Sequence, residues 1–319
     1  VTNNMEKLLQ WSTAQQSSDP EVRAQAPAPD PKLLAQVLGA DTGKDDAQLM
    51  KEDITVLVCD DPNISIDDKL IALEDFEMLV QNLDNANNIS PMGIWPEIAK
   101  LYTYEGEERD EFRGMGALIT GTAVQNNLKC QKDFLKHVGK EGFTSLMKLA
   151  DKGNNYNVRA RALYALSGLI GHNGDLYELF VESNGWDFLT GILAECFKNE
   201  KKDNKVLLRV LSLLKSILYD EVVEEGQEVR SSKKDRLCCV TDRNIVHLLT
   251  DKLSETTSSV EVNERIINIL SYLHENSFEF SSEDIKEIQQ KVASLSDHKV
   301  YNTEAVSYTH LTLPTICSV

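Results

Sequence analysis

The stretch FRGMGALITGTAVQNN occupies residues 112–127 of the chain, and VRARALYALSGLIGHN follows 46 residues later at residues 158–173. The two stretches align without a gap. The matched pairs are Arg113 and Arg159, Gly116 and Ala162, Gly121 and Ser167, Val124 and Ile170, and Asn127 and Asn173. Apolar residues recur at spacings of three and four in both copies, which is the period of an α-helix. The sequence therefore contains an internal repeat built on helices.

The repeat continues beyond these two stretches. A phenylalanine follows each copy, and then a glycine, an aromatic residue and a leucine, in GFTSL at residues 142–146 and GWDFL at residues 185–189. This offset is 43 residues, and periods of about 40–47 are typical of armadillo-type arrays. Small residues such as Gly116 allow helices to cross closely, and the glycine before each third helix permits a sharp turn. We therefore predict an all-α fold, an armadillo-like right-handed α-solenoid (an α-α superhelix).

Weaker copies of the repeat flank the two clear ones. Residues 66–82 with 95–101 supply the first copy, residues 205–218 the fourth and residues 262–273 the fifth, which residues 282–295 cap. Because the ends of a solenoid need atypical caps, degenerate terminal copies are expected.

Composition divides the remainder of the chain. Residues 5–31 are predicted to form a flexible N-terminal arm, because residues 12–31 are rich in Ser, Gln, Ala, Pro and Asp. Residues 32–64 are expected to form N-terminal capping helices, one of them at residues 32–38. Residues 65–297 are expected to hold the repeats and their C-terminal cap, interrupted by an inserted loop at residues 221–235.

The last segment breaks the helical pattern. Residues 306–315 read VSYTHLTLPT, which back-translates into the adapter of a transposase-based sequencing library. We expect residues 306–319 to be non-native, as a fusion scar would be, and the native C-terminus to be missing.

The charge balance bears on the kind of partner. The formal net charge is −18 at pH 7. Nucleic-acid binding needs a basic surface for the phosphates, so this class is excluded, and an anionic membrane is disfavoured. We expect a monomer whose partners are proteins with basic patches.

The cysteines and the apolar pattern bear on the compartment. The six cysteines form no CxxC pair, and we expect them to be small buried apolar residues in a reducing compartment. The start of the chain has no signal-peptide core, and no apolar run approaches the ~20 residues of a membrane span. The sequence therefore predicts a cytoplasmic protein.

No set of residues predicts catalysis. The nearest match to a phosphate loop, Gly39–Asp45, is one residue short between its glycines and carries Asp45 where Ser or Thr should hold magnesium. The histidines are scattered without metal-ligand spacing. We predict a protein that is not an enzyme and that needs no cofactor or metal.

Asparagines at helix ends are the polar residues that stand out. Each could cap the C-terminus of a helix, because asparagine tolerates the left-handed conformation there. The cluster at residues 85–88 is too long for one cap, which favours a contact surface along one edge of the stacked repeats. The predicted partner-binding residues are Asn82, Asn85, Ala86, Asn87, Asn88, Gln125, Asn126, Asn127, Arg159, Asn173 and Arg209.

The arginines in the repeats are expected to have two different roles. Arg113 and Arg159 are expected to neutralise helix ends or to pair with neighbouring carboxylates. Arg209 lies in an otherwise apolar helix and is expected to project onto the concave face of the solenoid.

Several stretches carry a resemblance to a family. They are MEKLLQWS at residues 5–12, PDPKLL at 29–34, FEMLVQNLDNANN at 76–88 and GTAVQNN at 121–127. Together they resemble the fungal armadillo-type nucleotide exchange factors of 70-kDa heat-shock (DnaK-type) chaperones, relatives of the human heat-shock-chaperone-binding protein. The departures are Gly114 and Gly116, where that family prefers alanine, and the loop at 221–235.

The resemblance implies a mechanism without catalysis. The concave face would clamp one lobe of the chaperone's nucleotide-binding domain, open the cleft and promote release of ADP and substrate. It also implies that Ala86 and Arg209 make contacts, and both are expected to face solvent in the free protein. The N-terminal arm would engage the chaperone's peptide-binding domain.

The alternative is a peptide-binding armadillo adaptor or scaffold of the nuclear-import kind. Such adaptors grip basic peptides with ladders of Trp-x-x-x-Asn. Here Trp95 is followed four residues later by Ala99, and Trp186 by Thr190, so the ladder is absent.

Deleting residues 306–319 should leave the thermal melting of the protein unchanged, because we expect this segment to be non-native. Circular dichroism of the full and shortened chains would check this. A loss of several degrees would show that the segment packs on the fold.

Overall fold

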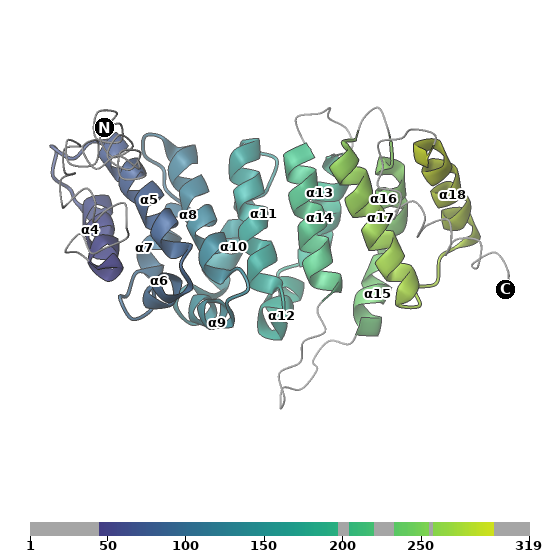
Figure 1. The fold of residues 1–319 in the computed structure, drawn as a ribbon, viewed down its shortest axis with the longest axis horizontal. Coiled ribbons are helices and arrows are strands. Elements are labelled where there is room, and N and C mark those ends of the chain that lie inside the picture. Colours follow the sequence, from purple (N-terminus) through teal and green to yellow (C-terminus); the bar gives the residue numbers. More distant parts are fainter. Residues whose placement is uncertain (1–44, 197–203, 220–232, 255–257, 297–319) are drawn as a thin grey trace, which may run out of the picture. The chain divides into compact units, whose positions relative to one another are not determined.

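A computed structural model describes residues 45–196, 204–219, 233–254 and 258–296 (Figure 1). These residues form α-helices joined by turns, and no strand occurs among them. The predicted N-terminal arm, the helix at 32–38 and the segment 306–319 lie outside the described residues.

Contacts divide the chain into two compact units, residues 1–52 and 53–319. In the first unit only the beginning of α4 (Asp46–Val58) is described.

Five long helices form a continuous layer in the second unit. Each packs against the next in the order of the chain, and α11 makes its most extensive contacts with α8 and α14 on its two sides (Figure 1). These long helices are α5 (Ile66–Val80), α8 (Arg109–Val124), α11 (Tyr156–Ile170), α14 (Asn204–Leu218) and α17 (Val260–Glu275).

Two further helices follow most of the long helices. The short helices are α6 (Leu83–Asn88), α9 (Leu128–His137), α12 (Gly174–Glu182) and α15 (Lys233–Asp242). The third helices are α7 (Trp95–Leu101), α10 (Gly139–Leu149), α13 (Gly185–Glu195) and α16 (Ile245–Lys252). Each third helix packs against the long helix that follows it in the chain, and α18 (Ser282–Ser296) packs on α16. This three-helix unit is the repeat that the sequence predicted.

The helices begin where the sequence supplies caps. Ser65 accepts a hydrogen bond from the backbone of Asp68, whose carboxylate accepts one from the Ser65 backbone in return. Asn155 caps α11 and Ser259 caps α17 in the same way with their side-chain oxygens. Such caps satisfy backbone N–H groups that have no partner within the helix, and each typically contributes about 1 kcal/mol.

Burial of the long helices follows their place in the layer. On α11, flanked by α8 and α14, residues such as Ala162, Leu166 and Ile170 are completely buried. The half-exposed residues of α14 form a single stripe, namely Asn204, Leu208, Arg209, Ser212 and Ser216, with exposed Lys205 and Lys215 beside them. This stripe faces away from the apolar side of α14.

Glycines permit the closest helix contacts. A Cβ on Gly116 of α8 would lie 2.7 Å from the Leu101 Cβ and 3.4 Å from the Ile98 carbonyl oxygen of α7. A Cβ on Gly121 would collide with the Tyr164 ring of α11. The prediction that small residues allow close crossing is confirmed at both positions.

The prediction that a glycine makes the turn before each third helix is wrong for Gly142. For Gly185, the residue before it makes the turn. Gly142 lies inside α10, and the turn before that helix is made by Gly139 with φ +64°. In the next repeat, Gly185 begins α13 and the left-handed conformation belongs to Asn184, with φ 57°. Asparagine can adopt this conformation at modest cost, so the turn does not require glycine.

The predicted loop at 221–235 ends three residues too late. Residues 220–232 lie outside the described part of the chain, whereas residues 233–235 form the first turn of α15.

Replacing Gly116 with alanine should lower the free energy of unfolding by about 1–3 kcal/mol, because α7 and α8 must separate to admit the methyl group. Denaturant unfolding followed by circular dichroism would measure the change.

The matched control for this prediction is Gly191→Ala in α13, where an added Cβ has no heavy atom within 4 Å. There the loss of glycine's backbone freedom should stabilise the helix by about 0.5–1 kcal/mol. A stabilising Gly116→Ala would contradict the packing described for α7 and α8.

Candidate partner-binding surface

Asparagines begin the short helices. The Oδ1 atoms of Asn82, Asn127 and Asn173 accept hydrogen bonds from backbone N–H groups in the first turns of α6, α9 and α12, at 2.9, 3.3 and 3.0 Å. The prediction that these three asparagines close the long helices is therefore wrong. The left-handed conformation at those ends belongs to Asn126 (φ 52°) and His172 (φ 58°), one residue earlier in each repeat.

The same asparagines join successive repeats. Nδ2 of Asn127 donates to Oδ1 of Asn87 at 3.2 Å, and Nδ2 of Asn173 donates to Oε1 of Gln131 at 3.2 Å. Gln131 in turn donates through Nε2 to the carbonyl oxygens of Gly168 and Gly171, at 2.8 and 2.9 Å. The end of α11 is thus tied to α9 and α12 by one buried glutamine.

Gln131 was missed by the sequence analysis. A signal was present, because it lies between Leu128 and Phe134 at the three-residue spacing of the buried face of α9. A polar residue on such a face must find partners inside the protein, because an unpaired buried polar group costs about 1–3 kcal/mol. Only the structure shows which backbone carbonyls it meets.

The cluster at residues 85–88 is largely internal. Asn85 is buried and donates to the Leu79 carbonyl oxygen at 2.9 Å. Ala86 is 2% exposed, and its carbonyl oxygen accepts a hydrogen bond from the Cys130 thiol. The prediction that Ala86 faces solvent is therefore wrong, because α6 turns this residue toward α9. Asn87 and Asn88 are half-buried.

Exposed carboxamides remain on the same edge. Asn82, Gln125 and Asn126 are exposed. A cleft of about 320 Å³ lies between the α8–α9 and α11–α12 connections. Its lining residues are Asn126, Asn127, Leu128, Gln131, Lys132, Gly171, His172, Asn173, Gly174 and Asp175. The cleft brings together three of the predicted contact residues from two repeats.

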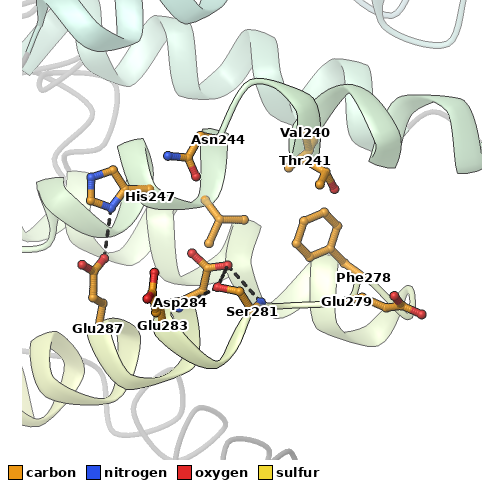
Figure 2. Close-up of a pocket in the computed structure, with 11 residues that line it drawn as sticks. Val240, Thr241, Asn244, His247, Phe278, Glu279, Ser281, Glu283, Asp284 and Glu287 are labelled. Carbon is orange, nitrogen blue, oxygen red and sulfur yellow. Dashed lines mark hydrogen bonds and ion pairs between the residues drawn. The ribbon is translucent and has the colours of Figure 1, made fainter.

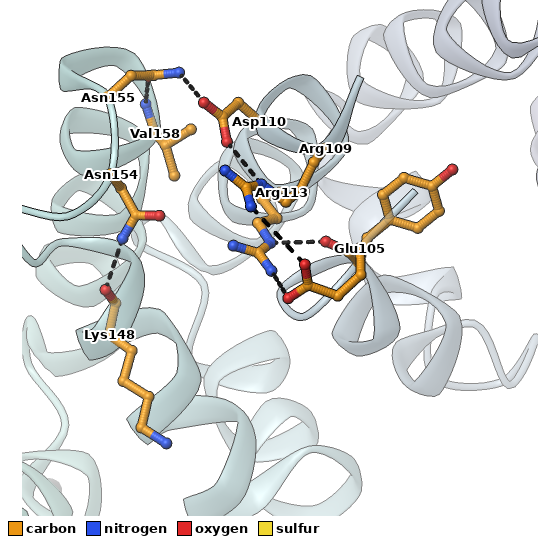
Figure 3. Close-up of polar contacts among 9 residues, drawn as sticks. Glu105, Arg109, Asp110, Arg113, Lys148, Asn154, Asn155 and Val158 are labelled. Atoms are coloured by element: carbon orange, nitrogen blue, oxygen red, sulfur yellow. Dashed lines mark hydrogen bonds and ion pairs between the residues drawn. The ribbon is translucent and has the colours of Figure 1, made fainter. Parts of the chain in front are cut away.

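Two arginines pair with carboxylates, as predicted, and Arg159 also binds the end of a third helix. Nε of Arg113 donates to the Tyr104 carbonyl oxygen at 2.8 Å, and the guanidinium pairs with Glu105 (Figure 3). Nε of Arg159 donates to the Ala150 carbonyl oxygen at 2.9 Å, and Nη2 lies 3.3 Å from Glu195. Because Arg159 is buried by these contacts, the structure places it in the framework and away from the surface.

Near Arg113, the residue that caps one long helix also forms a hydrogen bond with the preceding long helix. Figure 3 shows Asn155, the cap of α11, reaching Asp110 in the first turn of α8, with Nδ2 2.8 Å from Oδ2.

Arg209 lies on the half-exposed stripe of α14. Its guanidinium carbon is 4.8 Å from the centre of the Tyr164 ring of α11, the geometry of a cation–π contact. Arg209 is half-buried on the side of α14 away from its apolar face, and its place on the concave face stays a prediction.

A second cleft, of about 380 Å³, lies between α16 and the beginning of α18 (Figure 2). The Ser281 hydroxyl caps α18 by accepting a hydrogen bond from the Asp284 backbone, and the Asp284 carboxylate accepts one from the Ser281 backbone. Glu287 lies 3.1 Å from Nδ1 of His247. Both carboxylates thus already have partners within the cleft, and they tie the last described helix to α16.

The cysteines only partly match the prediction of small buried residues. Cys130 and Cys196 are buried, whereas Cys238 is exposed. All five cysteines in the described ranges are free thiols. Burial raises the pKa of the Cys130 thiol to about 12, so it stays protonated at neutral pH.

Neither a metal centre nor a membrane span is found in the part of the chain that the structure describes. No three His, Cys, Asp or Glu side chains gather there closely enough to hold a metal ion. None of the described helices combines the length and apolarity that a bilayer crossing requires.

Solved structures define the class of protein. A designed armadillo repeat protein, YIII(Dq)4CqI, superimposes with a TM-score of 0.59 at 12% identity, covering 85% of this chain and 99% of that one. The designed protein YIII(Dq.V1)4CPAF, solved in complex with the peptide (KR)4, gives a TM-score of 0.60 at 13% identity, with the same coverage. The fold is thus an armadillo-type α-solenoid.

Sequence relatives define the family. Residues 5–89 match the family described as "Nucleotide exchange factor Fes1". Proteins named "Hsp70 nucleotide exchange factor FES1" are 35% identical in Eremothecium gossypii (91% of this chain, 93% of that protein) and 35% identical in Saccharomyces cerevisiae (90% and 92%). The one from Scheffersomyces stipitis is 37% identical (92% and 95%). The chain belongs to the Fes1 family of Hsp70 nucleotide exchange factors, which confirms the resemblance seen in its sequence.

Replacing Ala86 with arginine should lower the free energy of unfolding by about 3 kcal/mol or more, because a long charged side chain cannot fit at a buried site without leaving its charge unpaired. Thermal melting of the purified variant would show this loss.

Gln125→Arg is the control, because Gln125 is exposed on the same edge and its replacement should change stability by no more than about 0.5 kcal/mol. An Ala86→Arg variant that melts like the parent protein would mean that α6 opens readily.

Proposed function

We propose that this chain is a nucleotide exchange factor for an Hsp70 chaperone. It clamps one lobe of the chaperone's nucleotide-binding domain, opens the nucleotide cleft, and promotes release of ADP and substrate. The observation that carries the proposal is the match of 35% identity over nine tenths of the chain to proteins with that name. The action needs no catalysis by this chain.

The mechanism is a shift in population. A ligand moves a two-state equilibrium only by its differential affinity for the two states, so the solenoid must bind the open nucleotide cleft more tightly than the closed one. Linkage then requires reciprocity, and ADP must weaken binding of the exchange factor by the same factor. Couplings of this kind are typically about 1–3 kcal/mol.

The solenoid must be rigid to bind the open cleft more tightly than the closed one, because a flexible solenoid would adapt to both states and bind them equally. The hydrogen bonds of Asn127, Gln131 and Asn173 fasten the first repeat to the second and the second to the third. We assign Asn85, Ala86, Asn127, Arg159 and Asn173 to this supporting framework.

The contacts themselves belong to exposed residues. Arg209 on α14 and the carboxamides of Asn82, Gln125 and Asn126 are accessible, and Asn87 and Asn88 are partly so. These side chains supply polar groups on the first, second and fourth repeats, so a partner lobe that contacts all of them must span those repeats.

The proposal includes the setting of the activity. The chain acts as a monomer in the cytoplasm, binds neither nucleic acid nor membrane, and does not hydrolyse ATP. The net charge of −18 supports the exclusion of nucleic acid.

A peptide-binding adaptor is the second candidate, since a designed armadillo relative in fold was solved with the peptide (KR)4. Two observations disfavour it for this chain. Trp95 and Trp186 are buried in third helices, so neither can grip a peptide. Arginines and lysines on the exposed side of α14 would also repel a basic peptide.

The purified protein should accelerate release of fluorescent ADP from a purified Hsp70, and Arg209→Ala should weaken its apparent affinity about tenfold because a charged contact is lost. Stopped-flow fluorescence at several concentrations of the protein would measure both effects.

Arg243→Ala is the control for Arg209→Ala, because Arg243 is similarly half-exposed but pairs with Asp187 on the layer of third helices. Unchanged ADP release in the presence of the parent protein would refute the proposed function.

A further inference from the structure

Three arginines lie in the first half of three successive long helices. They are Arg161 of α11, Arg209 of α14 and Arg265 of α17. We call this set the arginine row. All three side chains are half-buried, and the helices that carry them are neighbours in the layer.

Each arginine of the row is held by the long helix before it. The Arg161 guanidinium occupies the space that a side chain at Gly114 of α8 would take, since a Cβ on Gly114 would lie 2.8 Å from Nη1. The same Nη1 lies 3.4 Å from a carboxylate oxygen of Glu111. Gly114, one of the departures from the family pattern, therefore seats Arg161.

The second arginine is held by an aromatic ring. Arg209 lies over Tyr164, and the Tyr164 ring in turn lies where a Cβ of Gly121 would be. A glycine, a tyrosine and an arginine from three successive helices thus form one stack. The stack fixes the guanidinium without neutralising it, because no carboxylate pairs with Arg209 among the described residues.

The third arginine is held by backbone and hydroxyl oxygens. Nη1 of Arg265 donates to the Leu208 carbonyl oxygen at 3.1 Å and to the Ser212 hydroxyl, and Nη2 lies 3.1 Å from Glu261. All three guanidiniums are thereby placed in advance of any partner, which lowers the entropy lost on binding.

The charge of the two central helices is opposite to that of the chain. α11 and α14 contain no aspartate or glutamate, whereas they carry Arg159, Arg161, Lys205, Arg209 and Lys215. Lys205 and Lys215 are exposed beside the row. The carboxylates near it lie on the flanking helices, at Glu111 of α8 and at Glu261 and Glu264 of α17.

We propose that the arginine row binds an acidic segment on the surface of the partner, with carboxylates of that segment lying across α11, α14 and α17. Guanidinium groups match carboxylates with paired, charge-assisted hydrogen bonds, and fixed guanidiniums do so at least cost. The identity of the partner as an Hsp70 nucleotide-binding domain rests on the proposed function. Tyr164 is a positioning residue that aims Arg209.

The test uses the full chain and a purified Hsp70, with binding measured by calorimetry and ADP release measured in parallel at several salt concentrations. Arg161→Gln and Arg265→Gln should each weaken binding about three- to tenfold and reduce its salt dependence. Arg243→Gln is the matched control, because its side chain is 29% exposed against 28% for Arg161 and 32% for Arg265. It should bind like the parent.

A variant that is expected to tighten binding separates an effect on binding from an effect on folding. Glu111→Gln removes the carboxylate that competes for Arg161, so it should tighten binding about two- to threefold. Misfolding cannot produce such a gain. Tyr164→Phe should retain the stack and the affinity, whereas Tyr164→Leu should weaken binding in the parent and have little further effect in Arg209→Ala.

The outcomes distinguish the two proposals. If the parent accelerates ADP release but the row variants match Arg243→Gln and Glu111→Gln brings no gain, the arginine row is not the contact and the proposed function stands. If the parent neither binds Hsp70 nor accelerates ADP release, the proposed function falls, and the partner assigned to the row falls with it.

Discussion

The rest of the structure depends on the packing of α11 between α8 and α14. No repeat can bury its own long helix, so each relies on the two neighbours to remove that helix from water, as in solenoids generally. Tyr164 shows how close this packing is, because its ring fills the space left by Gly121 and then supports Arg209. One contact between helices thus determines both the core and the orientation of a surface cation.

The ends of the helices impose a second constraint. A helix leaves backbone N–H and C=O groups without partners at its two ends, and burying them unpaired is costly. Asn127 and Asn173 meet part of this need with Oδ1, and use Nδ2 to reach the neighbouring repeat. Gln131 satisfies two carbonyl oxygens at the end of α11. Because these groups are committed inside the protein, the asparagines form a framework that keeps the exposed edge in register.

Charge is distributed very unevenly along this chain. The net charge of −18 suggests a partner with basic patches, yet α11 and α14 carry only cations among their charged residues. Screening confines electrostatic contacts to roughly 10 Å, so a partner responds to the local set of charges and not to the total.

The sequence by itself determined the helices, their repeat of 43–46 residues and the family, because these depend on periodicity and on local motifs that survive in a linear string. It also predicted correctly that Arg113 and Arg159 pair with neighbouring carboxylates. Only the tertiary structure decided that Ala86 and Asn173 are buried and that Gln131 joins two repeats. It alone brought Arg161, Arg209 and Arg265 into one row. The physical reason is that burial and alignment depend on which residues of neighbouring repeats meet, and insertions of a few residues between repeats hide that register from the sequence.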